Sequence, residues 1–168
     1  VDLYSSLEKL NLSVWLDVKM DTRGEAAMKE GVINSKCVIS IITGVTQDGN
    51  VDNAFFNRSF CIKELEWAME ASIQIQPVIC VEDKKKIGTF LEQAPDHLKF
   101  LGIIDFIHLD RSDNDYWQVG INKIVKAMNK GLTSDVHQAM KQGLSERDVA
   151  EGGSVSSNNV GCGNCAVQ

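Results

Sequence analysis

The apolar run C-V-I-S-I-I at positions 37–42 constrains the fold more than any other feature of this chain. A strand that faces water on one side alternates polar and apolar residues, whereas this run is almost continuously apolar and rich in β-branched side chains. A strand of this kind is buried on both faces, which is typical of a parallel sheet covered by helices.

Helical and strand-like segments alternate on both sides of this run. The Gly-, Asn- and Asp-rich sequence over residues 43–57 predicts a long loop, and Ser59 is then expected to cap a helix. We expect Pro77 to open a strand, where its missing N–H is best tolerated. The predicted elements are a helix on Leu3, Leu7 and Leu10, strand 13–17, helix 25–34, strand 37–42, helix 59–72, strand 77–81, strand 106–109 and a helix that ends at Gly131.

This alternation predicts an α/β fold in which an open parallel sheet is flanked by helices through right-handed crossovers. Such sheets bind ligands beyond the carboxyl ends of their strands, and the 43–57 loop lies at that edge. Glu64 follows in the second turn of the next helix, where the nearby N-terminus favours an ionised carboxylate. Glu64 is therefore the first candidate site residue, although spacing alone favours an ordinary solvent-facing glutamate.

Several segments, taken in order, resemble a TIR domain, the flavodoxin-like signalling module of immune proteins. The S-F-C-I-K-E-L segment is similar to the family signature S-x-W-C-x-x-E-L, with Phe60 in place of the usual Trp. The segments that carry the resemblance are V-W-L-D (14–17), D-V-K-M-D-T-R-G-E (17–25), S-K-C-V-I-S-I-I (35–42), S-F-C-I-K-E-L (59–65) and P-V-I (77–79).

The resemblance implies a TIR-like domain over residues 1–131 and a tail over 132–168 that is helical at first and then disordered. The family normally begins with a strand of the type D-V-F-I-S-Y, and nothing before Leu3 supplies one. We therefore expect an N-terminally truncated sheet. A missing central strand would leave apolar surface exposed and backbone hydrogen-bonding groups unpaired, which favours a longer chain. The biological chain is expected to extend further upstream.

Some TIR domains cleave NAD+ between nicotinamide and ribose, and the resemblance places their catalytic carboxylate at Glu64. Cleavage builds positive charge on the ribose, which a nearby carboxylate stabilises or captures covalently. Phe60 lies on the same helical face and would stack on a ring of the substrate, with a core aromatic as the alternative. Trp15 would lie near the cleft or pack against a helix. Lys19 and Arg23 would contact phosphates or a neighbouring subunit, with simple solvation as their default.

The alternative function is a non-enzymatic TIR adaptor or scaffold that works by contacts with other TIR domains or with itself. In TIR assemblies the loop at 17–25 makes such contacts, and Gly24 is expected to supply the backbone angles of a tight turn there. A more distant alternative is a flavodoxin-like or response-regulator module, whose acidic pocket on the first strand this chain does not show.

The composition narrows the partners. The net charge of −6 argues against a nucleic-acid surface, and the basic run at 84–86 is typical of a solvated loop. Cys162 and Cys165 form an isolated C-x-x-C without the four ligands that zinc needs, so no metal site is expected. No cofactor is implied, since NAD+ would be the substrate. Apolar surroundings of the other cysteines and the absence of a secretory signal favour a reducing, cytoplasmic setting.

The tail carries a lipidation motif. Residues 134–149 are expected to form a weakly amphipathic helix, followed by a Gly-, Ser- and Asn-rich disordered stretch. The final C-A-V-Q fits a prenylation box on Cys165, and Cys162 would carry a second acyl chain, because one lipid alone anchors only marginally. This hypothesis adds membrane anchoring to the cytoplasmic location. A chance match of the short motif is the alternative.

Overall fold

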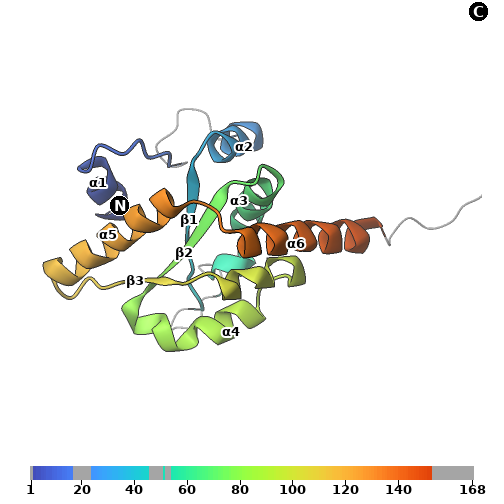
Figure 1. Ribbon diagram of the computed structural model, residues 1–168. Helices are drawn as coiled ribbons and strands as arrows, with labels where there is room; N and C mark the ends of the chain where they lie inside the picture. Colours follow the sequence, from blue (N-terminus) through green and yellow to red (C-terminus); the bar gives the residue numbers. More distant parts are fainter. Residues whose placement is uncertain (1, 17–23, 46–50, 52–53, 153–168) are drawn as a thin grey trace, which may run out of the picture.

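The computed structural model describes residues 2–16, 24–45, 51 and 54–152 (Figure 1). Helices and strands alternate from α2 to α5, as the sequence predicts. The elements are α1 (Asp2–Glu8), α2 (Glu25–Ile33), β1 (Cys37–Ile41), η2 (Phe55–Asn57), α3 (Ser59–Glu70), β2 (Gln74–Cys80), η3 (Val81–Lys86), α4 (Ile87–Glu92), η4 (Asp96–Ile103), β3 (Ile107–Leu109), α5 (Asn114–Lys130) and α6 (Ser134–Gly152).

The described strands form one parallel sheet in the order β1-β2-β3, which confirms the predicted α/β class. The β1–β2 register runs from Cys37↔Gln74 to Ile41↔Val78, and the β2–β3 register runs from Val78↔Ile107 to Cys80↔Leu109. β2 is the central strand. Among the described residues, β1 has no neighbour on its other side, so it forms one edge of the sheet.

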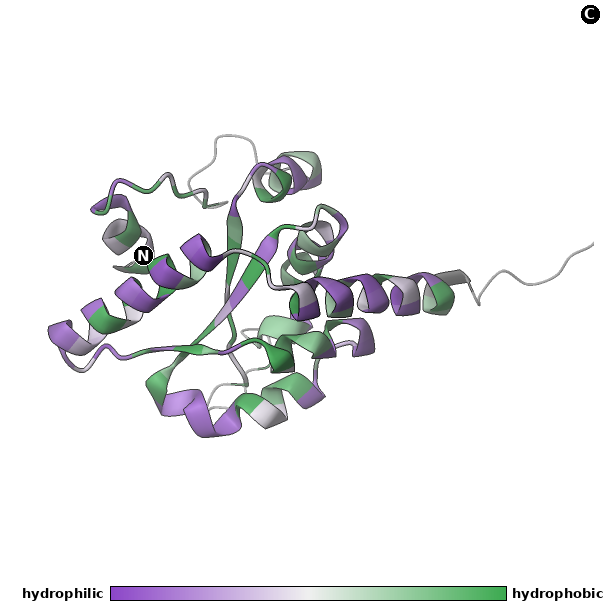
Figure 2. Ribbon diagram, viewed as in Figure 1, coloured by the Kyte–Doolittle hydropathy of each residue, from purple (hydrophilic) through white to green (hydrophobic). Residues whose placement is uncertain are grey.

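The sheet separates two apolar clusters, so the fold has three layers. On one face α3 packs against the sheet, and residues of α2, α4, η4 and α6 complete its cluster (the α2/α3 cluster). On the other face α5 packs against the sheet together with α1 (the α1/α5 cluster; Figure 1). Ile75 and Ile79 of β2 face the first cluster, whereas Val78 between them faces the second. The central strand is thus buried on both faces, and Figure 2 shows how the helices turn polar residues outward.

The predicted strand at 13–17 is wrong for the residues that the structure describes. Residues 12–16 have no regular secondary structure. Val14 packs against the α1/α5 cluster and Trp15 against the α2/α3 cluster, so the side chains alternate as in a strand. No described strand lies beside them to accept their backbone hydrogen bonds, and without a ladder the extended segment is no strand. Asp17 lies outside the described residues.

Pro77 was predicted to open its strand, but it lies inside β2, which begins at Gln74. The Val78 carbonyl accepts a hydrogen bond from the Ile42 N–H at 2.9 Å, on the β1 side. Because successive residues of a strand point their backbone groups to opposite sides, Pro77 faces the β3 side. The ladder with β3 begins only at Val78↔Ile107, so the missing N–H of Pro77 breaks no ladder bond there.

The ends of α3 and α5 differ in how they are capped, and the predicted cap of α3 is wrong. Ser59 is the first residue of α3 rather than its cap, since Arg58 is the N-cap and no side chain caps this end. Asp113 does cap α5, because its carboxylate accepts from the Asp115 and Tyr116 N–H groups at 2.7 and 3.4 Å. Gly131 ends α5 as predicted, with a φ of 77° that favours glycine.

Helix α6 lies against the rest of the fold as far as Arg147, while its far end projects outward (Figure 1). The predicted apolar side of this helix is confirmed, because Met140 is 1% exposed and both Val136 and Leu144 pack against the α2/α3 cluster. Arg147 donates to Glu70 of α3 at 2.9 Å. A Cβ at Gly143 would meet the His97 carbonyl at 2.4 Å, which shows how closely α6 approaches η4.

Candidate functional site

A groove of about 930 Å³ runs along the edge of β1 that no described strand covers. Leu3 and Leu7 of α1 form one wall, α2 and α3 form the other, and Ile39 and Ile41 of β1 contribute the floor. The volume lies within the range of roughly 300–1,000 Å³ that is usual for small-molecule sites. The walls are mainly apolar, with a few polar side chains among them, which is also usual for such sites.

Glu64 lies in this groove and is half-buried. It belongs to a stripe formed by Cys61 and Glu64 of α3 together with the N-cap residue Arg58, all of which line the groove. Residues three apart on a helix are surface neighbours, so the stripe follows one side of α3. The structure therefore brings the first candidate residue of the sequence to a cavity wall.

Trp15 takes both positions that the sequence left open, beside the groove and against a helix. Its indole lines the groove and also packs on α2, where a Cβ at Gly31 would lie 2.4 Å from the indole Cε2 atom. Gly31 thus provides the space that the ring occupies. Trp15 and Glu64 line the same cavity from different segments of the chain.

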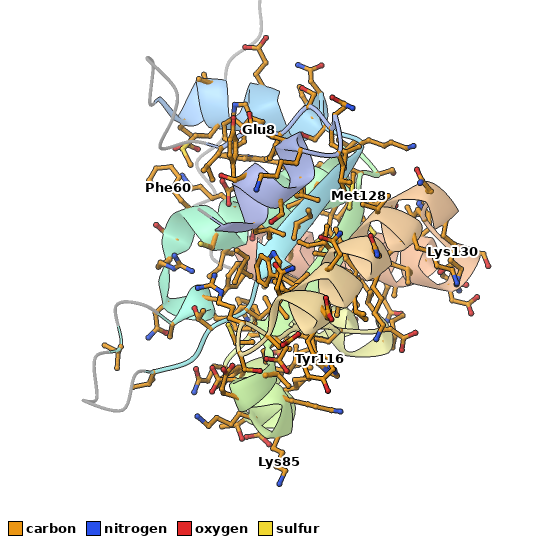
Figure 3. The ribbon with its side chains drawn as sticks, turned by 90° about the vertical axis from the view of Figure 1, so that its left-hand side faces the viewer. Glu8, Phe60, Lys85, Tyr116, Met128 and Lys130 are labelled. Carbon is orange, nitrogen blue, oxygen red and sulfur yellow. The ribbon has the colours of Figure 1, made fainter. Side chains whose placement is uncertain are left out.

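Phe60 does not line the groove. Its side chain is 45% exposed and points outward from α3, as Figure 3 shows. The Lys63 ammonium lies 5.5 Å from the centre of the Phe60 ring, a cation–π contact. The core alternative for Phe60 therefore fails, and the stacking prediction would need the substrate to extend beyond the groove.

The other predicted site residues fall outside the described residues. Lys19 and Arg23 lie in the 17–23 segment, and Cys162 and Cys165 lie in the 153–168 segment. Their assigned roles stay predictions. Gly24 is described, and here the expected turn geometry is wrong: its φ of −97° and ψ of 155° are extended values that any residue adopts.

Arg58 is a groove residue that the sequence reasoning missed. Its guanidinium carbon lies 5.8 Å from the centre of the buried Phe55 ring, which also lines the groove. The sequence does contain a pattern that indicates it, because Arg58 stands six residues before Glu64, at twice the three-residue spacing of helix neighbours.

Cys37 lies at the amino end of β1 and lines the same groove. Burial raises the pKa of its thiol from 9.0 to about 12. The thiol is therefore protonated at neutral pH and is a poor nucleophile, since the thiolate is the reactive form.

Metal-binding clusters and membrane-spanning helices are both absent from the described part of the chain. No group of three or more His, Cys, Asp or Glu side chains there could hold a metal ion. None of the helices described is both long and apolar enough to cross a membrane.

The fold and the groove define an α/β protein with a small parallel sheet flanked by helices, an arrangement consistent with a flavodoxin-like fold. No protein-family model matches the chain, and no curated protein matches it. The resemblance to TIR domains accordingly stays a prediction from the sequence segments.

Proposed function

We propose that this chain is the TIR-like part of a self-associating signalling protein that hydrolyses NAD+ to nicotinamide and ADP-ribose. Glu64 is the catalytic carboxylate in this proposal. The observation that carries it is the position of Glu64, half-buried on the wall of a groove of about 930 Å³ together with Trp15.

The chemistry requires little beyond one well-placed carboxylate. The bond between the ribose C1′ and the nicotinamide nitrogen breaks, and its electron pair leaves with nicotinamide as a neutral group. Glu64 stabilises the positive charge that develops on the ribose, or captures C1′ covalently. Water then adds its oxygen to C1′ and releases a proton, which completes ADP-ribose. No general acid is needed for the leaving group.

The apolar walls support this role. Leu3, Leu7 and Trp15 reduce contact with water, and electrostatic interactions strengthen as the local dielectric constant falls. The groove follows the edge of β1 that no described strand covers, and a further strand paired there, about 4.8 Å from β1, would occupy much of this space. For this reason the activity is tested on the full-length protein.

Product analysis tests the proposed reaction. Full-length protein incubated with NAD+ is expected to release nicotinamide and ADP-ribose in equal amounts, or a cyclic form in place of ADP-ribose. NADH is the control substrate, because its uncharged dihydronicotinamide is a poor leaving group and should remain intact. Absence of nicotinamide release in both the dilute and the self-associated protein would refute the enzyme and favour the adaptor.

A further inference from the structure

We propose that Arg58 binds the pyrophosphate of the dinucleotide while Glu64 faces the nicotinamide ribose. This inference rests on the proposed function and adds a substrate-binding residue to the same groove. It also assigns the direction in which the substrate lies along α3.

The spacing of the α3 stripe fits the substrate. Six residues separate Arg58 from Glu64, which corresponds to about 9 Å along a helix at 1.5 Å per residue. In NAD+ a single ribose separates the bond that breaks from the nearer phosphate. The long side chain of Arg58 covers the difference between about 9 Å along the helix and the shorter span from ribose to phosphate in NAD+. Cys61 lies between Arg58 and Glu64 on the groove wall, and its small side chain leaves room for the substrate.

The position of Arg58 in the sheet also fits. The Phe55 N–H donates to the Thr43 carbonyl at 2.9 Å, which fixes the start of α3 just beyond the carboxyl end of β1. The guanidinium is placed over the ring of Phe55 at this end of the groove. Open parallel sheets bind nucleotides beyond the carboxyl ends of their strands, so the phosphates belong at the Arg58 end.

Charge provides the third argument. The chain has a net charge of −6, and Glu30 and Glu64 add carboxylates to the groove, so a pyrophosphate needs a cation beside it. Arg58 forms no ion pair with a carboxylate in the described part of the chain, and its N–H donors match phosphate oxygens in pairs. Lys36 also lines the groove, but it precedes β1 and belongs to the opposite end.

Substrate truncation tests the assignment in the full-length protein. We expect Arg58→Gln to raise the KM for NAD+ by about tenfold to a hundredfold, with little change in kcat. Nicotinamide riboside has the same bond to ribose but no phosphate, so its KM should not change. Arg58→Lys keeps the charge but not the paired donors, so its KM for NAD+ should lie between the values for the wild-type protein and Arg58→Gln. Lys29→Gln is the control, because it removes the same charge from an ion pair with Glu70 outside the groove.

Equal effects of Arg58→Gln on both substrates, or no effect on either, would overturn the assignment. The assignment would also be overturned if Lys36→Gln, and not Arg58→Gln, raised the KM for NAD+ while leaving that for nicotinamide riboside unchanged. NAD+ binding to a Glu64→Gln protein, with and without Arg58→Gln, separates the two proposals. Binding that depends on Arg58 without any wild-type turnover would support this inference and refute the hydrolase, whereas binding independent of Arg58 would refute the inference alone.

Discussion

Glu64, Arg58 and Cys37 show how the same groove gives three side chains different chemistry. Glu64 and Arg58 belong to one stripe of α3, whereas Cys37 belongs to β1 and lies among apolar neighbours. A buried thiol avoids ionisation, because burial penalises the charged form. Cys37 is therefore a groove cysteine that its buried environment keeps in the unreactive thiol form.

Cys37 yields the prediction at the residue scale. In the native protein at pH 8, iodoacetamide should label Cys37 far more slowly than in the urea-unfolded protein, since burial raises the native pKa to about 12. Peptide mass spectrometry after timed labelling measures both rates. Because burial penalises only the thiolate, the fold should lose stability as the pH rises from 9 toward 12, where the unfolded thiol ionises and the native thiol does not. Equally fast labelling in both states would contradict the assigned environment.

At the scale of elements, the long and strongly patterned segments were predictable from sequence. β1 begins where predicted and α3 begins within one residue of its predicted start, because a continuous apolar run and a helical period are local signals. The extended segment at 13–17 was not predictable, since its state depends on a neighbouring strand rather than on its own residues. Pro77 misled for a similar reason: only the register with β3 shows why an interior proline is tolerated.

Helix α6 gives the prediction at this scale. Met140→Ala is expected to lower the free energy of unfolding by about 2–5 kcal/mol, because it leaves a cavity in the core where α6 meets the rest of the fold. Val149→Ala is the control on the same helix, since Val149 is 74% exposed and should have little effect. Thermal and urea unfolding measure both. Equal stability of the two variants would show that α6 does not belong to the cooperative core.

At the scale of the whole molecule, the site was only partly predictable. Glu64 came from a sequence signature, and its place in the groove depends on α1, α2 and β1 coming together, which no local pattern specifies. Phe60 was expected beside Glu64 because they are four residues apart, but the groove follows the stripe at three-residue spacing instead. The side of a helix that faces a cavity is decided by tertiary packing.

Self-association is the whole-molecule prediction that Gly24 tests. A Cβ at Gly24 would meet no atom of the described residues within 4 Å, and its backbone is extended, so Gly24→Leu should leave the unfolding midpoint unchanged. If the segment before α2 mediates contacts between subunits, the same change should abolish self-association. Sedimentation velocity measures the assembly. If Gly24→Leu leaves the assembly unchanged, the segment before α2 does not mediate self-association. If the monomeric variant still cleaves NAD+, catalysis does not need assembly.

The central claim is that Glu64 cleaves NAD+, and the rate of nicotinamide release by the full-length protein tests it most directly. Glu64→Gln keeps the size of the side chain and removes its charge, so the rate should fall by at least about a hundredfold. Glu92→Gln makes the same change on the exposed end of α4, outside the groove, and should leave the rate unchanged. Nicotinamide release by Glu64→Gln at the wild-type rate would contradict the account.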